Sequence, residues 1–424
     1  MSEGGLAEQV QAWLEANWDT SLTVREWWRR LADAGYTSPA WPAGLGGSGA
    51  SRRDAMTITA VLARNGVIGP PAGHLASNLA APTLLEHATE AQQVELVRPI
   101  ATGEAAWCQL FSEPGSGSDL ASICTRAVRD GDEWVVTGQK VWNSSADSAD
   151  RGMLLARTDI DVPKHAGMTY FAIDMKQPGI EVRPLKQMNG ASNFCEVFLT
   201  EARVRNDRVI GVVGGGWRVA QTTLFHERNS VAGIGAMPGL VMARSGSEGD
   251  LDRKVGEVLD RAREAAKARK SPIRAGAVPA RLMVELARNY GVSGDPVIRQ
   301  ELARYVTQVR VNGWTMRRSG VAGGKLTGAD GSVAKLTTAR ICQQSRDLSY
   351  QIVGAQGMLM EEGSPLEGDL QMVNLASPGN RLGGGTDEIQ LTVLGERALG
   401  LPREPSSDKD VPYRDLKVGT QVER

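Results

Sequence analysis

The chain has 424 residues, of which 41% are hydrophobic and 23% are charged, a composition typical of a folded globular protein and not of a disordered one. At this length we expect two or three domains with a large core. The formal net charge of −1 excludes the overall basic character on which nucleic-acid-binding proteins rely. The basic run 261–270 is short, and we interpret it as the solvated end of a helix.

Cysteine and histidine usage narrows the possible chemistry. The four cysteines form no CxxC pair, and the four histidines are not at ligand spacing from one another, so we expect no metal site. No apolar stretch approaches the ~18 residues of a membrane span, and the start of the chain lacks the features of a secretory signal. These observations predict a cytoplasmic protein whose difficult chemistry is carried by an organic cofactor.

The first part of the chain, residues 1–106, is predicted to be a helical domain. Apolar residues recur at helical spacing in several successive segments. A loop rich in Pro and Gly, 42–49, separates the second and third of these segments. The expected helices are Leu6–Ala16, Val24–Ala34, Ser51–Ala63, His74–His87 and Glu90–Ala101.

Residues 107–217 are predicted to form an all-β domain, a small barrel or sandwich. Short β-prone runs alternate with turn sequences such as 130–132, 143–150 and 178–179. The expected strands are Trp134–Thr137, Met153–Ala156, Thr169–Ile173, Ile180–Arg183 and Cys195–Leu199.

Helical periodicity returns after residue 217, and residues 218–402 are predicted to form a helical bundle. Pro296–Met316 and Ala329–Gln351 are its longest expected helices. Residues 403–424 are polar, and we expect a tail there and not a packed element. The predicted fold is therefore mainly α with a central β-domain, in the order helical, β, helical.

The segment Leu110–Ser122 contains four serines, with Pro114, Gly115 and Gly117 interspersed among them. Such a loop can lie flat against a ligand and offer it backbone N–H groups. On composition alone, an ordinary surface turn is an equally good interpretation.

This loop resembles the signature loop of the acyl-CoA dehydrogenase family, whose helical–β–helical order the chain shares. The resemblance implies that the loop, with Phe111, Ser112, Gly117 and Ser118, contacts a bound FAD. Ser112 would hydrogen-bond the isoalloxazine edge, and Ser118 would also meet the CoA part of the substrate. The activity implied is the α,β-desaturation of an acyl-CoA thioester.

Four further segments are similar to family segments in the same order. Gly138–Ser145 resembles the β-domain segment in which Trp142 and Ser144 would contact the flavin, although Trp142 could also be a core residue. Arg299–Ala303 resembles the helix whose arginine reaches the FAD diphosphate of a neighbouring subunit, a role suited to a forked guanidinium. The segments 351–357 and 383–390 add Gln351, Gly354, Thr386 and Glu388 as implied cofactor-binding residues.

The reaction requires a base that removes the α-proton, and a carboxylate whose pKa is raised by desolvation suits this task. Many family members carry this glutamate where the present chain has Gly384. A minority places it on the first helix of the C-terminal domain, directly before an arginine. By resemblance, Glu227 is the base, Arg228 orients it or binds substrate, and the N–H of Gly384 polarises the thioester carbonyl. The alternative interpretation of Glu227 is an exposed helix acid.

The absent side chain at position 384 favours a bulky acyl group, which could be branched, long-chain or steroid-derived. The resemblance further implies an oligomer, a dimer or dimer of dimers of like or unlike chains, and an electron-transfer flavoprotein as electron acceptor. Two other functions remain open: an oxygen-using flavin oxidase or monooxygenase, and a non-catalytic partner subunit. The polar, charged segment 245–278 is longer than the family's usual connection, and its role is left open.

Overall fold

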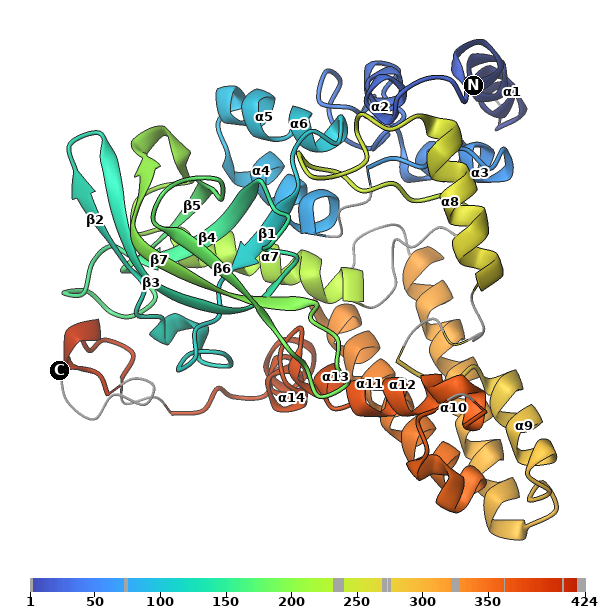
Figure 1. Cartoon of the computed structure of the whole chain (residues 1–424). Coiled ribbons are helices and arrows are strands. Elements are labelled where there is room, and N and C mark those ends of the chain that lie inside the picture. Colours follow the sequence, from blue (N-terminus) through green and yellow to red (C-terminus); the bar gives the residue numbers. More distant parts are fainter. Residues whose placement is uncertain are drawn as a thin grey trace.

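In the computed structural model, a central β-sheet lies between two groups of helices (Figure 1). The structure describes residues 3–71, 75–231, 240–268, 273, 276–321, 328–361, 363–405 and 408–417. The predicted order of helical, β and helical parts is confirmed.

Three of the described N-terminal helices begin at a residue whose side chain caps the first turn. Thr23 and Thr89 each form a capping box, with Glu26 and Gln92 respectively, which satisfies otherwise unpaired N–H groups of the first turn. Every helix predicted in this region is present, although His74 lies outside the described residues. The elements are α1 (Glu3–Asn17), α2 (Val24–Asp33), α3 (Arg52–Arg64), a π-helical turn (Ala76–Ala80), α4 (Ala81–His87), α5 (Glu90–Leu96) and α6 (Arg98–Ala101).

Eight strands form one connected sheet in the order β6-β7-β3-β2-β4-β5-β8, with β1 paired in parallel to β4. All five predicted strands are present, whereas β1, β2 and β8 were not predicted. The expected turn 143–150 begins late, because β3 continues through a bulge to Ser144. The strands are β1 (Trp107–Leu110), β2 (Arg126–Asp130), β3 (Glu133–Ser144), β4 (Arg151–Arg157), β5 (Met168–Asp174), β6 (Ile180–Leu185), β7 (Phe194–Arg205) and β8 (Val209–Ile210).

The C-terminal part starts at Gly216 with α7, whose buried face packs on β5 and on the helices around α4. The long helices α10 and α11 pack against each other. Helix α9 contacts both of them, and α12, α13 and α14 contact α11. The helices are α7 (Gly216–Val231), α8 (Val255–Ala268), α9 (Ala280–Asn289), α10 (Pro296–Val321), α11 (Gly328–Val353), α12 (Asp369–Ala376), α13 (Gly379–Leu382) and α14 (Asp387–Val393). No helix among the described residues combines the length and apolar character needed to cross a bilayer.

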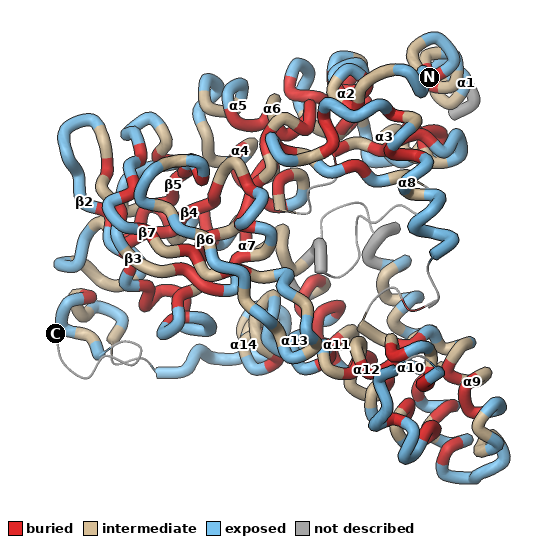
Figure 2. The backbone as a smooth tube through the Cα atoms, viewed as in Figure 1, coloured by how far each residue is buried: buried red, intermediate tan, exposed pale blue. Residues whose placement is uncertain are grey.

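The largest apolar cluster joins all the parts that surround the signature loop. It contains Leu79 and Leu84 from the N-terminal helices, Phe111 and Tyr170 from the sheet, and Val219 from α7. Buried residues, red in Figure 2, run through the sheet into these helices. Burial of this apolar surface fixes the helix that carries Glu227 against the strand that precedes the loop.

The first part of the segment 245–278, residues 245–268, packs on the N-terminal helices. Its apolar residues Leu251, Val255 and Val258 are buried in the same cluster as Trp27 and Trp28 of α2. Backbone N–H groups of α2 donate to carbonyls of this segment, for example Arg25 N to Leu251 O at 2.9 Å. The segment therefore packs on the N-terminal helices and not with the C-terminal bundle to which residues 218–402 were assigned. Residues 269–272, 274 and 275 of the segment 245–278 lie outside the described residues.

The expectation of an unpacked tail is wrong for residues 408–417. Tyr413 is only 2% exposed, and the N–H groups of Tyr413 and Arg414 donate to the carbonyls of Val162 and Ile160. A single aromatic residue in a polar segment was a weak signal, and the sequence alone did not indicate which surface it would meet.

Candidate active site

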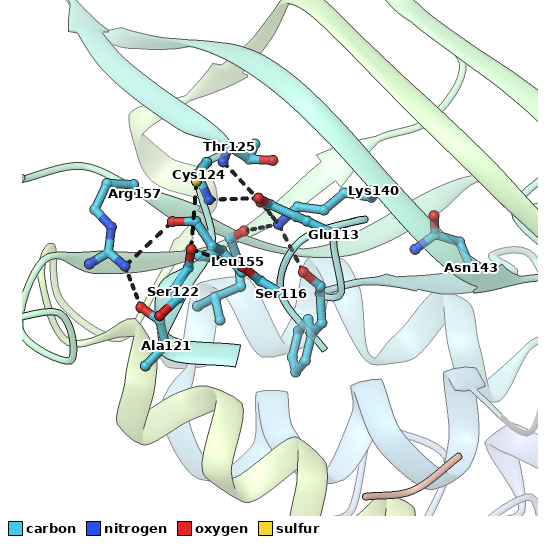
Figure 3. A network of polar contacts seen from close by, with 12 residues as sticks. Glu113, Ser116, Ala121, Ser122, Cys124, Thr125, Lys140, Asn143, Leu155 and Arg157 are labelled. Atoms are coloured by element: carbon cyan, nitrogen blue, oxygen red, sulfur yellow. Dashed lines mark hydrogen bonds and ion pairs between the residues drawn. The ribbon is translucent and has the colours of Figure 1, made fainter. Parts of the chain in front are cut away.

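A buried ion pair between Lys140 and Glu113 fixes the signature loop that follows β1 (Figure 3). Lys140 Nζ lies 2.8 Å from Glu113 Oε1 and donates to the carbonyls of Phe111, at 3.0 Å, and Leu155, at 2.8 Å. The Lys140 side chain is completely buried. Three acceptors thus surround the ammonium group, which satisfies all of its donors.

Glu113 also holds the far end of the loop. Its carboxylate accepts the backbone N–H groups of Cys124, at 2.6 Å, and Thr125, at 2.9 Å. Burial alone would raise the pKa of Glu113, but Lys140 and these donors hold the pKa below its ordinary value. One ionised carboxylate therefore fixes both ends of the loop to β3.

The predicted ligand-contacting residues of the loop differ in their accessibility. Phe111 is 3% exposed, and its ring packs edge-on against Tyr170, so little of the ring is accessible to a ligand. Ser112 is half-buried, and its carbonyl accepts from Val141 N at 2.9 Å. Gly117 and Ser118 are exposed at the turn. The hydroxyls of Ser112 and Ser118 stay predicted cofactor contacts.

Trp142 is held in a strained and exposed position next to the loop. Its φ of 62° lies in the left-handed region, which bulky residues rarely adopt, and it stands in the bulge between β3 and β7. The indole is 61% exposed. The interpretation of Trp142 as a core residue is therefore wrong. Strain of this kind is found where a side chain must face a ligand.

The two residues after Trp142 add polar groups to the same strand end. Asn143 is 1% exposed; its Nδ2 donates to Gln109 O at 2.7 Å, while its Oδ1 is buried without a partner in the structure. Ser144 is half-buried and pairs with Phe194 of β7. An exposed indole, adjacent hydroxyls and an unused buried acceptor together fit a planar, polar-edged cofactor such as a flavin.

Glu227 lies on α7 and faces strand β1. Gln109 Nε2 of β1 lies 3.2 Å from Glu227 Oε2 and donates to it. Burial raises the pKa of Glu227 above its ordinary value, and the Gln109 hydrogen bond and the Arg228 charge offset only part of this effect. The interpretation of Glu227 as an exposed helix acid is therefore wrong.

Buried hydroxyl groups fix the register of α7 against the rest of the site. Thr223 Oγ1 lies 2.9 Å from Thr83 Oγ1 and 3.2 Å from the Tyr170 hydroxyl. Because Thr223 and Glu227 are one helical turn apart, these contacts also set the position of Glu227. Arg228 follows Glu227, is half-buried, and has a buried Nε without a partner in the structure.

Gly384 precedes α14 in a left-handed conformation. Its φ is 68°, and its carbonyl accepts from Gln390 Nε2 at 2.6 Å, while Gln390 Oε1 accepts from Ser332 Oγ at 2.6 Å. Gln390 and Ser332 are completely buried, so the Gly384 backbone is fixed by a rigid pair. A glutamate at this position would be strained, which agrees with a base located elsewhere.

The residues after Gly384 mainly support the start of α14. Thr386 is its N-cap and accepts from Ile389 N at 3.2 Å. Asp387 is paired with the buried Lys335, at 3.0 Å, and with Arg381, at 2.7 Å. Glu388 is exposed and stays a predicted cofactor contact.

Helices α9 and α10 extend away from the sheet (Figure 1). Arg299 in the first turn of α10, Gln351 in the last turn of α11 and Gly354 just after α11 are all exposed. Within one chain the structure does not bring them together with Ser112 or Trp142. Arg299 lines a pocket of about 490 Å³ between α9 and α10, which also contains Arg288. Arg288 was not predicted from the sequence, because its helix lies outside the segments that resemble family motifs.

The sequence analysis also missed the residues that support the site. Lys140 could have been found, because strand alternation places it on the same face as Trp134 and Val136, both buried. A lysine on that face needs a buried partner. Gln109 and Asn143 carried no such signal, since their contacts depend on how β1 meets α7 and β3.

Comparison with known families gives a consistent result along the chain. Residues 4–104, 108–202 and 272–399 match the N-terminal, middle and C-terminal domains of acyl-CoA dehydrogenase, respectively. Acyl-CoA dehydrogenase IpdE1 of Mycobacterium tuberculosis is 35% identical over 381 residues, which cover 90% of this chain and 88% of that protein. The chain belongs to the acyl-CoA dehydrogenase family.

Other relatives and solved structures agree with this assignment. Acyl-CoA dehydrogenase FadE34 of Mycobacterium tuberculosis is 38% identical over 88% of this chain, which corresponds to 46% of FadE34. The Tcur3481-Tcur3483 steroid ACAD superposes with a TM-score of 0.66 at 26% identity, over 95% of this chain and 98% of that chain. The ChsE4-ChsE5 complex of Mycobacterium tuberculosis gives 0.63 at 25% identity, over 95% and 98% of the two chains. This acyl-CoA dehydrogenase is therefore a flavin-dependent oxidoreductase that acts on CH–CH bonds.

Proposed function

We propose that this chain catalyses the FAD-dependent α,β-dehydrogenation of an acyl-CoA thioester, with Glu227 as the base. One observation carries the proposal. The desolvated carboxylate of Glu227 lies beside β1, next to the loop and strand end that fit a flavin, while position 384 has no side chain. Together with the family, this arrangement favours a base on α7.

The residues at the ends of β1 and β3 would hold the flavin ring. Ser112, Ser118 and Ser144 offer hydroxyl groups, and Trp142 offers an exposed aromatic face. The pocket with Arg288 and Arg299 suits the diphosphate of a dinucleotide, because two guanidinium groups can bind its oxygens in a forked geometry. Since this pocket is remote from Trp142 in one chain, we infer that it serves the FAD of a neighbouring subunit.

The chain's own residues account for the proton transfer. Glu227 accepts the α-proton, and its raised pKa makes it a stronger base than an exposed glutamate. Gln109 orients the carboxylate. The Gly384 N–H, in a backbone fixed through Gln390, would donate to the thioester oxygen and stabilise the charge that develops there. When bound, FAD supplies the acceptor for the hydride that leaves Cβ, and a double bond forms between Cα and Cβ.

The absent side chain at position 384 supports a bulky substrate, which could be branched, long-chain or steroid-derived. Similarity to the Tcur3481-Tcur3483 steroid ACAD supports the steroid-derived class. We further propose an electron-transfer flavoprotein as the acceptor that reoxidises the enzyme, and an oligomer built from copies of this chain or with a related chain.

The experiment that tests this function is anaerobic titration of the flavin-loaded protein with a panel of acyl-CoA thioesters. The panel includes straight short, straight long, branched and steroid-side-chain thioesters. Bleaching of the flavin absorbance by the bulky members, with the enoyl-CoA as product, is expected. A loaded protein that no thioester bleaches, but whose reduced flavin reoxidises rapidly in air, would favour an oxygen-using enzyme. Protein that takes up no flavin would favour a partner subunit.

A further inference from the structure

The C-terminal segment 408–417 lies beyond residue 399, where the last of the matching family domains ends. It nevertheless follows the loop after β4 in a defined register. Pro412 forms a bridge with Pro163, and the adjacent N–H groups of Tyr413 and Arg414 donate to that loop. Ion pairs at both ends, Asp408 with Lys164 and Arg414 with Asp161, hold the segment in place.

Tyr413 is the buried residue of this segment, and its hydroxyl reaches the signature loop. It donates to Ile123 O at 3.0 Å, with Ser122 O at 3.4 Å, and lies 3.1 Å from Cys124 Sγ. These three residues end the loop whose first part carries Ser112. The neighbouring N–H of Cys124 is the one that Glu113 binds. The peptide group between Ile123 and Cys124 is therefore bound from both sides, its N–H by Glu113 and its C=O by Tyr413.

Arg157 connects the tyrosine to the same stretch. Its guanidinium lies 3.8 Å from the centre of the Tyr413 ring and is 2% exposed. It donates to Ala121 O at 2.6 Å, as Figure 3 shows, and to Lys164 O at 2.5 Å. A buried cation on an aromatic face is an attractive contact, so loss of the ring would also loosen Arg157.

We propose that Tyr413 is a positioning residue that fixes residues 121–124, and through them the shape of the loop that binds the flavin. The segment 408–417 thus supports a loop whose residues Ser122 and Ile123 precede Tyr413 by 291 and 290 positions. The proposal rests on the role of this loop in flavin binding put forward above. Its effect on the loop itself can be measured without any flavin or substrate.

The test compares three variants with the wild type. Tyr413→Ala removes the ring and the hydroxyl, Tyr413→Phe removes only the hydroxyl, and Asp415→Ala, an exposed residue of the same segment, is the control. Hydrogen exchange of the amides in residues 112–125 is measured in the flavin-free protein. The dissociation constant for FAD is then measured by titration, with the visible spectrum of the bound flavin recorded.

We expect faster exchange at residues 122–125 in both Tyr413 variants, together with a shifted flavin spectrum. FAD affinity should fall about tenfold in Tyr413→Ala and less in Tyr413→Phe, because a buried hydrogen bond is worth roughly a factor of ten and Tyr413 acts on the flavin only through the loop. Asp415→Ala should match the wild type. Unchanged exchange in both variants, or FAD affinity within twofold of the wild type in Tyr413→Ala, would overturn the proposal. Tyr413→Phe keeps the ring over Arg157 and serves if Tyr413→Ala does not fold. A wild type that binds FAD but that no thioester bleaches contradicts the proposed function and leaves this one standing.

Discussion

The protonation of Glu227 is set by two opposing influences. Burial raises its pKa, and the hydrogen bond from Gln109 and the charge of Arg228 lower it again in part. As the proposed base, Glu227 must be ionised to accept a proton, so we expect activity to be full above its raised pKa and to be lost as pH falls through it. The pH dependence of flavin reduction therefore reports directly on this carboxylate.

Replacement of Gln109 should move that dependence in a defined direction. In Gln109→Ala the carboxylate loses a donor that stabilises its charged form, so its pKa rises further. We expect the acid side of the rate profile to shift to higher pH. The rate of anaerobic flavin reduction, measured across the pH range, checks this. Gln221→Ala, an exposed glutamine on α7, is the control, and a shift to lower pH would contradict the assignment of Gln109.

At the scale of elements, the buried pair under the signature loop joins that loop to β3 and β4. Lys140→Met leaves Glu113 as an uncompensated buried charge, which we expect to cost about 3–5 kcal/mol of unfolding free energy. Lys140→Met combined with Glu113→Gln should recover part of the loss, because no buried charge is left alone. The unfolding free energy of each variant is measured by denaturant titration, monitored by tryptophan fluorescence.

The matched control for this pair is Arg281→Ala, which breaks the exposed i,i+4 pair with Glu285 and should cost under about 0.5 kcal/mol. A double variant as unstable as Lys140→Met would show that the charge imbalance is not the cause.

Glu113 also makes the stability of the protein depend on pH. Its pKa is lowered by folding, so its contribution to stability is present at neutral pH and is lost as pH falls through the lowered value.

The elements also show how far sequence reasoning reached. Helical spacing around Trp27 and Trp28 predicted α2, which buries one face. Short β-prone runs predicted β4 and β5, which are buried along almost their whole length. Strand β2 was missed, since only Ala127 is buried in it and its pattern is largely polar. Periodicity indicates which face of an element is buried, but it does not identify the element that packs against that face.

The same limit applies to the site. Glu227 and Gly384 were predicted from motifs, since both belong to segments that resemble a family pattern. Gln109 and Tyr413 could not be predicted, because their partners Glu227 and Ile123 are 118 and 290 positions away in sequence. Such contacts depend on strand order and on how the chain's parts pack.

At the scale of the whole molecule, the proposed site is divided between the sheet and the remote pocket with Arg288 and Arg299. If the pocket serves a neighbouring copy, two defective variants should complement each other. Glu227→Gln lacks the base, and Arg299→Ala lacks a diphosphate contact. In a mixed dimer, the site that keeps Glu227 receives its arginine from the Glu227→Gln chain.

We expect co-refolded mixtures of these two variants to regain activity, up to about a quarter of the wild-type value for random pairing in a two-fold dimer. Each variant refolded alone is the control. Dehydrogenase activity with an artificial electron acceptor provides the measurement. A mixture no more active than its components would place Arg299 and Glu227 in the same site of one chain, or would exclude a dimer of like chains.

The most direct test of the central claim is the rate of anaerobic flavin reduction in Glu227→Gln, measured by stopped flow with the best thioester of the panel. Glu86→Gln, an exposed acid on the neighbouring α4, is the matched control. We predict normal FAD content and a reduction rate lower by roughly 10²- to 10⁴-fold in Glu227→Gln, the usual contribution of a general base. Reduction at the wild-type rate would show that another group removes the α-proton.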